Sequence, residues 1–186
     1  EKLKVVTEAQ AKEKAADFLK ISSDDLQLLS KTNNNLSTYT FYNRDFTISV
    51  TQKGAIVVSV LKSQYVSEIK LSYDEAIKKA AEYLREHGYS KVKESYYSTT
   101  DGICTINFSY YNNGVTYYTD LIKVSVALDT GDITGFDATG YIMNHKTRTI
   151  PQNLKYSPIE GKKLVNKNLT ILSYKKAFIP TEWESE

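Results

Sequence analysis

The sequence predicts an α+β fold of tandem units, each made of one α-helix packed on an antiparallel β-sheet meander. Three observations lead to this prediction. Residues 6–19 and 71–84 match in pattern without a gap, sharing an Ala-Ala pair, an acid, an aromatic residue and a leucine. Both copies have helical spacing, and the sequence after each copy alternates between apolar and polar residues, as half-buried strands do. An internal repeat of this kind defines the architecture before any single element is assigned.

Both repeated segments carry the signals of a helix that packs closely on a sheet. Each begins with a capping box, in which a hydroxyl residue is followed three positions later by Gln or Glu; the pairs are Thr7 with Gln10, and Ser72 with Glu75. Small or apolar residues then recur every four positions, which places them in one narrow stripe. The stripes consist of Ala11, Ala15 and Leu19 in the first helix and Ala76, Ala80 and Leu84 in the second.

The strands follow from the alternation and from the turn residues between alternating runs. In the first unit, predicted as residues 1–68, the strands are expected at 26–30, 37–42, 46–51 and 56–61. In the second unit, predicted as residues 69–150, they are expected at 92–99, 103–111, 115–118, 122–128 and 133–136. Asn113-Gly114 between two alternating runs is a strong hairpin signal. Each unit is therefore expected to be a helix followed by a meander.

Residues 151–186 predict the start of a truncated third unit. Ser157 and Glu160 form another capping box, with Pro158 at the first helical position. A helix from Ser157 to about Val165 and a strand over 169–179 are expected. A lone strand exposes unpaired backbone groups. We therefore expect it to pair with the edge of the second unit, with a neighbouring chain in a homodimer, or with residues absent from this sequence.

Composition excludes several classes of function. The net charge of +2 leaves no basic stripe of the kind a nucleic-acid binder needs. The longest apolar stretch, residues 55–61, is far shorter than the ~20 residues of a membrane helix, so no membrane contact is expected. A single cysteine allows no internal disulfide, and two distant histidines provide no transition-metal site. No cofactor is expected. The chain opens without a basic leader or an apolar signal core, and we interpret it as a piece of a longer protein.

One stretch of the sequence resembles a known family. Residues 126–145, VALDTGDITGFDATGYIMNH, continuing to Arg148 and Pro151, are similar to the segment that closes the second PepSY domain in the YpeB family of spore-germination proteins. Residues 48–54, ISVTQKG, are similar to a strand and turn of the first domain. The resemblance extends over essentially the whole chain. It identifies the chain as similar to the C-terminal region of such proteins, which is built from PepSY domains.

The resemblance implies a non-enzymatic role in germination. Proteins of this family accompany a cortex-lytic peptidoglycan hydrolase of the SleB type in the spore. The implied function is an accessory module that binds and stabilises this hydrolase, or inhibits it. The implied location is extracytoplasmic, between the inner membrane and the cortex, with an anchor in the parent protein that lies outside this sequence.

Tyrosines are the first candidates for a partner-binding surface. The chain has 15 of them, and several occur as pairs at 96–97, 110–111 and 117–118. Because successive strand residues face opposite ways, one ring of each pair is expected on the open face of the sheet. Tyr96, Tyr110 and Tyr117 are thus predicted contact residues for the hydrolase, since tyrosine is favoured at interfaces. Direct binding of cortex peptidoglycan by these rings is the alternative, and simple cross-strand packing is a third interpretation.

His145 and Arg148, in the connector after the second unit, are the other candidates. They are expected either to bond the connector onto the second unit or to contact the hydrolase. No catalytic residue is expected, because neither a nucleophile nor an acid accompanies the lone histidine. Cys104 alternates with Ile106 and Phe108, which predicts a core residue. The spacing of the acids in 129–137 fits no EF-hand, so no metal is expected.

Overall fold

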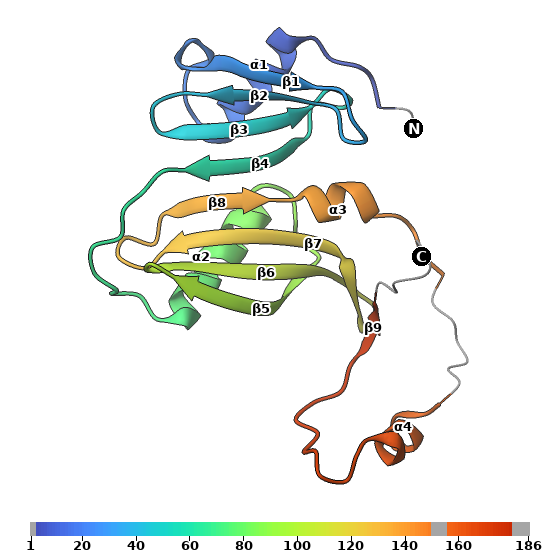
Figure 1. The fold of residues 1–186 in the computed structure, drawn as a ribbon. Coiled ribbons are helices and arrows are strands. Elements are labelled where there is room, and N and C mark those ends of the chain that lie inside the picture. Colours follow the sequence, from blue (N-terminus) through green and yellow to red (C-terminus); the bar gives the residue numbers. More distant parts are fainter. Residues whose placement is uncertain (1–2, 150–155, 180–186) are drawn as a thin grey trace.

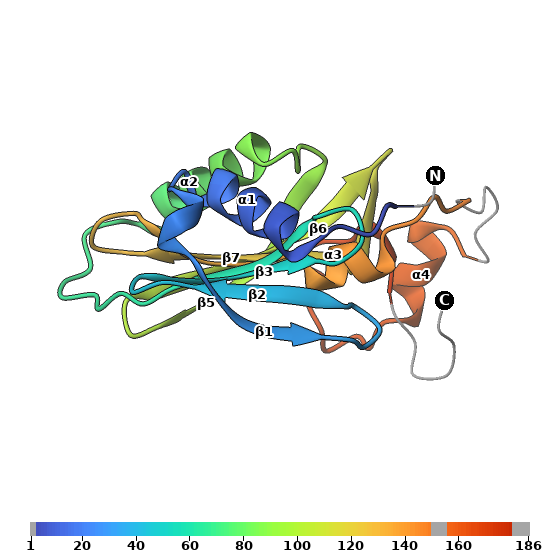
Figure 2. The same ribbon diagram turned by 90° about the horizontal axis from the view of Figure 1, so that it is seen from above.

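The fold consists of one large sheet with two helices on the same side of it. The computed structural model describes residues 3–149 and 156–179. Both long helices, α1 and α2, lie over one face of the sheet, and the opposite face carries no helix along most of its width (Figures 1 and 2). The helical elements are α1 (Glu8–Leu19), the short 3-10 helix η1 (Ser23–Asp25), α2 (Tyr73–Glu86), α3 (Thr139–Asn144) and α4 (Pro158–Leu164). The strands are β1 (Gln27–Thr32), β2 (Thr38–Tyr42), β3 (Phe46–Thr51), β4 (Val57–Lys62), β5 (Val92–Thr100), β6 (Ile103–Asn112), β7 (Val115–Ala127), β8 (Ile133–Asp137) and β9 (Lys176–Phe178).

The two predicted meanders are present, and they join edge to edge into one sheet. The strand order is β1-β2-β3-β4-β8-β7-β6-β5, with all these pairs antiparallel. The join is the β4–β8 pair, where Ser59 faces Asp137 and Leu61 faces Gly135. Alternating residues predicted the strands of each unit, whereas this join had no signal in the sequence. The α+β class and the tandem arrangement are confirmed.

Strand β7 runs unbroken over Val115–Ala127, although two strands were predicted there. The pairing with β6 passes from Ser109–Leu121 directly to Tyr110–Tyr117, so residues 118–120 of β7 bulge out of the ladder. The predicted gap between strands 115–118 and 122–128 corresponds to this bulge. Bulges bend a strand and change the direction of its side chains, and this one places Asp120 in the candidate site.

Helices α1 and α2 form as their capping boxes predict. Thr7 and Ser72 each accept a hydrogen bond from the backbone three residues on, and Gln10 and Glu75 bond back to the cap residue. The four alanines of the predicted stripes, Ala11, Ala15, Ala76 and Ala80, are fully buried against the sheet. Alanine leaves little side-chain bulk between helix and strands, so the helix backbone lies close to the sheet.

Aromatic rings from both units meet where the two meanders join. Phe136 of β8 is buried, and its ring centroid lies 5.6 Å from that of Phe18 in α1 and 5.9 Å from that of Tyr83 in α2. Phe18 in turn stacks on His87, at the end of α2, with a centroid distance of 3.9 Å. Unit one and unit two are therefore connected by side-chain packing as well as by β4–β8 pairing.

The His87 stack predicts a pH dependence of stability. Burial lowers the pKa of His87, and the nearby Lys20 lowers it further, against the opposing charge of Glu86. Since the folded pKa lies below the unfolded value of about 6.5, protonation favours the unfolded state. The contribution of neutral His87 to the free energy of unfolding is therefore fully present above the unfolded pKa, and it is lost as the pH drops towards the folded pKa. We expect a lower melting temperature at pH 5 than at pH 7.5, with a smaller difference for His87→Gln. An equal difference in both proteins would contradict the prediction.

The third unit begins as predicted but forms a shorter strand. Helix α4 has the capping box of Ser157 and Glu160, whereas the strand expected over 169–179 is limited to β9, Lys176–Phe178. That expectation was wrong in length. Strand β9 pairs in parallel with Val115–Tyr117 at the start of β7. Strand β8 occupies the same edge of β7 from Lys123 onward, so only the first part of that edge is open to β9. Pairing with the second unit is thus the outcome in the described residues, while the homodimer stays a prediction.

Candidate functional site

The most distinctive polar cluster is centred on Asp120, in the bulge of β7. Its side chain is completely inaccessible to solvent. A buried carboxylate is costly unless charged or hydrogen-bonding partners surround it. Asp120 has such partners, and they come from the connector that follows α3.

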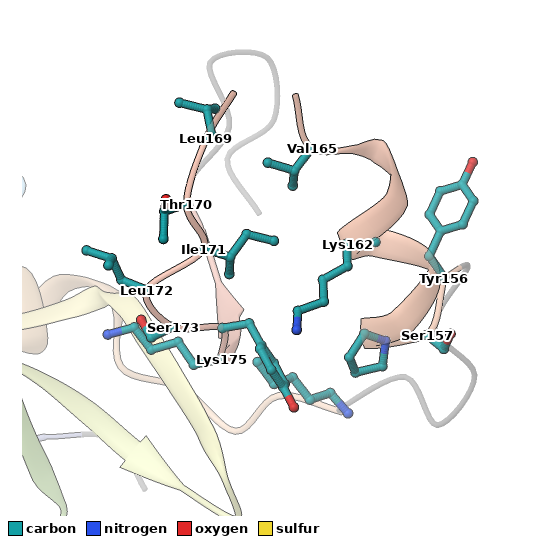
Figure 3. A pocket seen from close by; sticks show the side chains of 14 residues that line it. Tyr156, Ser157, Lys162, Val165, Leu169, Thr170, Ile171, Leu172, Ser173 and Lys175 are labelled. Carbon is teal, nitrogen blue, oxygen red and sulfur yellow. The ribbon is translucent and has the colours of Figure 1, made fainter. Parts of the chain in front are cut away.

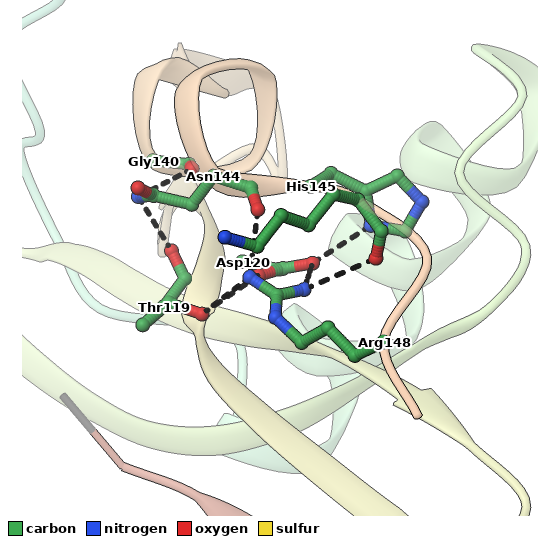
Figure 4. Close-up of polar contacts among 7 residues, drawn as sticks. Thr119, Asp120, Gly140, Asn144, His145 and Arg148 are labelled. Carbon is green, nitrogen blue, oxygen red and sulfur yellow. Dashed lines mark hydrogen bonds and ion pairs between the residues drawn. The ribbon is translucent and has the colours of Figure 1, made fainter. Parts of the chain in front are cut away.

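Arg148 and His145 both bond to this carboxylate (Figure 4). The Arg148 guanidinium donates from Nη1 to Asp120 Oδ2 at 3.0 Å and pairs through Nη2 with Oδ1 at 2.9 Å. His145 Nδ1 donates to Oδ2 at 2.7 Å. The two-pronged arginine contact fixes orientation as well as distance, and only 7% of the Arg148 side chain is exposed.

Neighbouring groups hold these three side chains in position. Thr119 donates its hydroxyl to Asp120 Oδ1 at 2.7 Å, and Arg148 Nη2 donates to the carbonyl of Asn144 at 2.7 Å. Asn144 itself donates to the carbonyl of Thr119 at 3.1 Å. Helix α3 approaches β7 closely at Gly140, where an added Cβ would lie 3.0 Å from the carbonyl oxygen of Leu121. The cluster therefore fastens α3 and the connector to β7.

The same cluster contacts β9 through Tyr117. The Tyr117 ring stacks on Phe178 of β9 at 5.0 Å, and the Arg148 guanidinium lies 5.5 Å from the same ring. Residues from β7, the connector and β9 thus meet at one ring. We call Asp120, His145, Arg148, Tyr117 and Phe178 the junction cluster.

The predicted tyrosine surface is only partly present. Tyr117 is 3% exposed, so the expectation that its ring lies on an open face was wrong. The ring of Tyr110 is half-buried between Tyr117 and His145, at centroid distances of 5.1 and 4.5 Å. Tyr96 is 55% exposed, as expected. The bulge in β7 explains the position of Tyr117, because it breaks the strict alternation on which that prediction depended. Tyr110 lies on β6, where alternation is regular and continues the buried face of Ile106 and Phe108, so the exposed ring of that pair is Tyr111.

The junction cluster is suited to holding the connector against β7. Its guanidinium and its imidazole both bond to its carboxylate, and this geometry favours the interpretation in which His145 and Arg148 bond the connector to unit two. Cys104 is buried, and burial raises the pKa of its thiol. Among residues 3–149 and 156–179, no group of three His, Cys, Asp or Glu side chains is placed to hold a metal ion.

Sequence reasoning missed Asp120, the central residue of the cluster. The signal was an isolated acid between the apolar residues of two predicted strands, at the break in their alternation. Its partners are 25 and 28 residues away in the sequence, so no local pattern connects them.

A second concave surface lies beside α4 (Figure 3). This pocket has a volume of about 700 Å³ and lies between α4 and residues 169–176, with Lys162 and Lys175 at its wall. The side chains around it are loosely packed: Leu172 is 92% exposed, and no residue of the described helix α4 is buried. Helices α1 and α2 cover the sheet with their apolar stripes, whereas the apolar residues of α4 stay accessible.

Each unit is a helix packed on a four-stranded meander, the unit occurs twice in tandem, and the junction cluster bonds the connector to the second unit. This arrangement is that of an α+β protein made of PepSY-like units. The family model described as YpeB sporulation, PepSY1 and PepSY2 domains matches residues 1–151. The chain therefore belongs to the YpeB sporulation protein family.

Individual relatives agree with this assignment. Sporulation protein YpeB of Oceanobacillus iheyensis is 33% identical over 172 residues, which are 89% of this chain and 38% of that protein. Sporulation protein YpeB of Halalkalibacterium halodurans is 30% identical, with 97% of this chain and 42% of that protein covered. This chain thus spans about two fifths of their length. The Bacillus megaterium YpeB C-terminal domain has the same fold, with a TM-score of 0.84 at 24% identity, covering 96% of this chain and 83% of that chain.

Further findings concern the role and the membrane. The relatives are sporulation proteins by name, which supports a role in sporulation or germination for this chain. No helix in the described parts of the chain has the length and apolar character needed to cross a membrane.

Proposed function

We propose that this chain is a non-catalytic accessory module that binds and stabilises a cortex-lytic peptidoglycan hydrolase of the SleB type and restrains it in the dormant spore. Family membership supports the setting, since the relatives are sporulation proteins. The proposed location is between the inner membrane and the cortex, in a parent protein held by a membrane anchor.

The observation that carries the proposal is the outer edge of β5. This strand ends the sheet order, and its backbone is therefore placed to pair with an added strand. Tyr96 and Tyr97 project from it to opposite faces and are both at least half-exposed. Tyr111 on the neighbouring strand β6 is also exposed, with Lys93 Nζ 5.5 Å from its ring. Exposed tyrosines beside a free strand edge are suited to binding a protein partner.

The junction cluster supports a second part of the proposal. It fixes the connector and β9 to the end of β7, so the third unit starts from a defined position relative to units one and two. We propose that a hydrolase contacts the sheet edge and the third unit together. His145 is partly accessible at this junction, with one third of its side chain exposed, and remains a proposed contact residue.

Size-exclusion chromatography with light scattering tests hydrolase binding. The chain mixed with a purified SleB-type hydrolase is expected to elute at the sum of the two masses. Tyr96→Ala is expected to weaken the association about tenfold or more, the effect of losing one interface anchor. Tyr65→Ala is the matched control, because Tyr65 is 87% exposed in the loop between β4 and α2.

Two results would contradict the proposal. Separate elution of both proteins at tens of micromolar would exclude hydrolase binding by this part of the protein. Release of soluble fragments from purified cortex by the chain alone would exclude the non-catalytic role. The alternative of peptidoglycan binding by tyrosine faces has weaker support, because only Tyr96 of the three predicted rings is well exposed.

A further inference from the structure

The face of the sheet opposite the helices carries two rows of mostly polar residues that cross both units. Register places one row directly across successive strand pairs: Ser30, Thr40, Ser49, Ser59, Asp137, Lys123, Asn107 and Tyr96. The adjacent row is Gln27, Tyr42, Thr47, Leu61, Gly135, Ser125, Thr105 and Ser98. With strands ~4.8 Å apart, each row is about 34 Å long.

These rows are almost uncharged and rich in hydroxyl groups. Their only two formal charges, on Lys123 and Asp137, lie directly opposite each other on β7 and β8. Hydroxyls also bond across the strands, as in Thr40 with Ser49 at 2.9 Å and Thr105 with Ser125 at 2.8 Å. Each hydroxyl in such a pair keeps further hydrogen-bonding capacity for a ligand. Asn107 is 4% exposed, and the other polar members of the rows form an array of donors and acceptors with no net charge.

A groove deepens this face at one side. It has a volume of about 540 Å³ and lies where the loop after β1 faces α3 across β3 and β4. Ser49 and Ser59 belong to the rows and also line the groove, with Asn35, Leu36 and Met143 at its walls. None of the described residues that line it is charged, although charged residues make up 25% of the chain. Hydroxyl, amide and small apolar contacts are therefore combined in one uncharged groove.

This chemistry distinguishes between classes of ligand. Nucleic acids and anionic membranes require several cationic side chains, and the rows contain one lysine, Lys123, which lies opposite Asp137. Protein interfaces are enriched in aromatic residues, Met and Arg and depleted in Ser, whereas eight of the sixteen row residues are Ser or Thr and two, Tyr42 and Tyr96, are aromatic. Sugars present hydroxyls that both donate and accept, and they match a hydroxyl array without charge.

We infer that this open face binds an uncharged, N-acetylated glycan strand. The sugar hydroxyls lie on the Ser and Thr rows, and one acetamido group enters the groove, where Asn35 bonds its amide and Met143 and Leu36 contact its methyl. The length of the rows fits an extended polymer rather than a single sugar. The inference goes beyond hydrolase binding and does not depend on it.

Co-sedimentation with insoluble chitin, an uncharged polymer of N-acetylglucosamine, tests the inference, with cellulose as the polymer that lacks acetamido groups. The chain is expected to sediment with chitin and to stay in solution with cellulose. Ser59→Glu places a charge in the groove, and the pair Asn35→Ala with Met143→Ala removes the acetamido contacts. Each is expected to reduce chitin affinity about tenfold, as for the loss of one or two neutral hydrogen bonds.

Ser67→Glu is the matched control, since it makes the same charge change at an exposed loop residue outside the rows, and it is expected to bind chitin normally. Circular dichroism melting verifies that each variant is folded. Equal sedimentation with cellulose, or chitin binding that Ser59→Glu leaves unchanged, would overturn the inference. Ser59 lies four strands from β5, so hydrolase binding is expected to survive Ser59→Glu. Loss of hydrolase binding with normal chitin binding in this variant would assign the face to a protein instead.

Discussion

Replacing Asp120 by alanine is expected to destabilise the protein by about 3–5 kcal/mol, the range for removing one partner of a buried ion pair. The reason is that Arg148, only 7% exposed, would keep its charge without the carboxylate that both of its terminal nitrogens contact. Urea unfolding followed by circular dichroism measures the loss. Asp74→Ala is the control, because Asp74 is an exposed acid in the first turn of α2, where the expected loss is only about 0.3–1 kcal/mol.

The same substitution is expected to release the connector and β9 before the rest of the fold. Hydrogen exchange should become faster over 145–149 and 176–178, while α1 and β2 keep their protection. In the double variant Asp120→Ala with Arg148→Met, part of the lost stability should return, because the buried guanidinium is removed together with the carboxylate that contacts it. A loss for Asp120→Ala no larger than that for Asp74→Ala would show that the junction cluster does not hold the connector.

Local signals explain how much of the fold the sequence could predict. Each capping box, at Thr7, Ser72 and Ser157, spans only four consecutive residues, and all three form as predicted. The strands of each meander alternate over short segments, and their ends agree with prediction to within a residue or two, apart from the bulge in β7. These features depend on neighbours in the sequence, so they can be predicted from a single sequence.

Features that depend on distant residues were not predictable in the same way. The join of β4 to β8 pairs residues more than 70 positions apart, as Ser59 with Asp137 shows, and each meander alone gives no reason for it. Asp120 was missed because its charge partners belong to a connector that folds back over β7. Tyr117 was misplaced because the bulge at 118–120 interrupts the alternation. In each case, tertiary contacts determined the position of a side chain that local pattern alone did not.

Replacing Phe136 by alanine is expected to have the other large effect and to separate the two units. Loss of a buried phenylalanine costs about 3–5 kcal/mol, and Phe136 is 2% exposed. Its ring lies against Phe18 of unit one and Tyr83 and Tyr89 of unit two. The cavity would therefore open at the join, where the β4–β8 pairs, the Phe18–His87 stack and the Lys62–Asp132 ion pair would remain as contacts between the units.

Phe108→Ala provides the matched comparison for this prediction. Phe108 is also 2% exposed, but it lies on β6, inside unit two and away from the join. Thermal unfolding of Phe108→Ala is expected to show one transition at a lower temperature, because the join still couples the units. Phe136→Ala should instead show two transitions, with α1 losing hydrogen-exchange protection at a different temperature from α2. A single transition in both variants would contradict the prediction: the other contacts across the join would then couple the units, and Phe136 would contribute stability without contributing cooperativity.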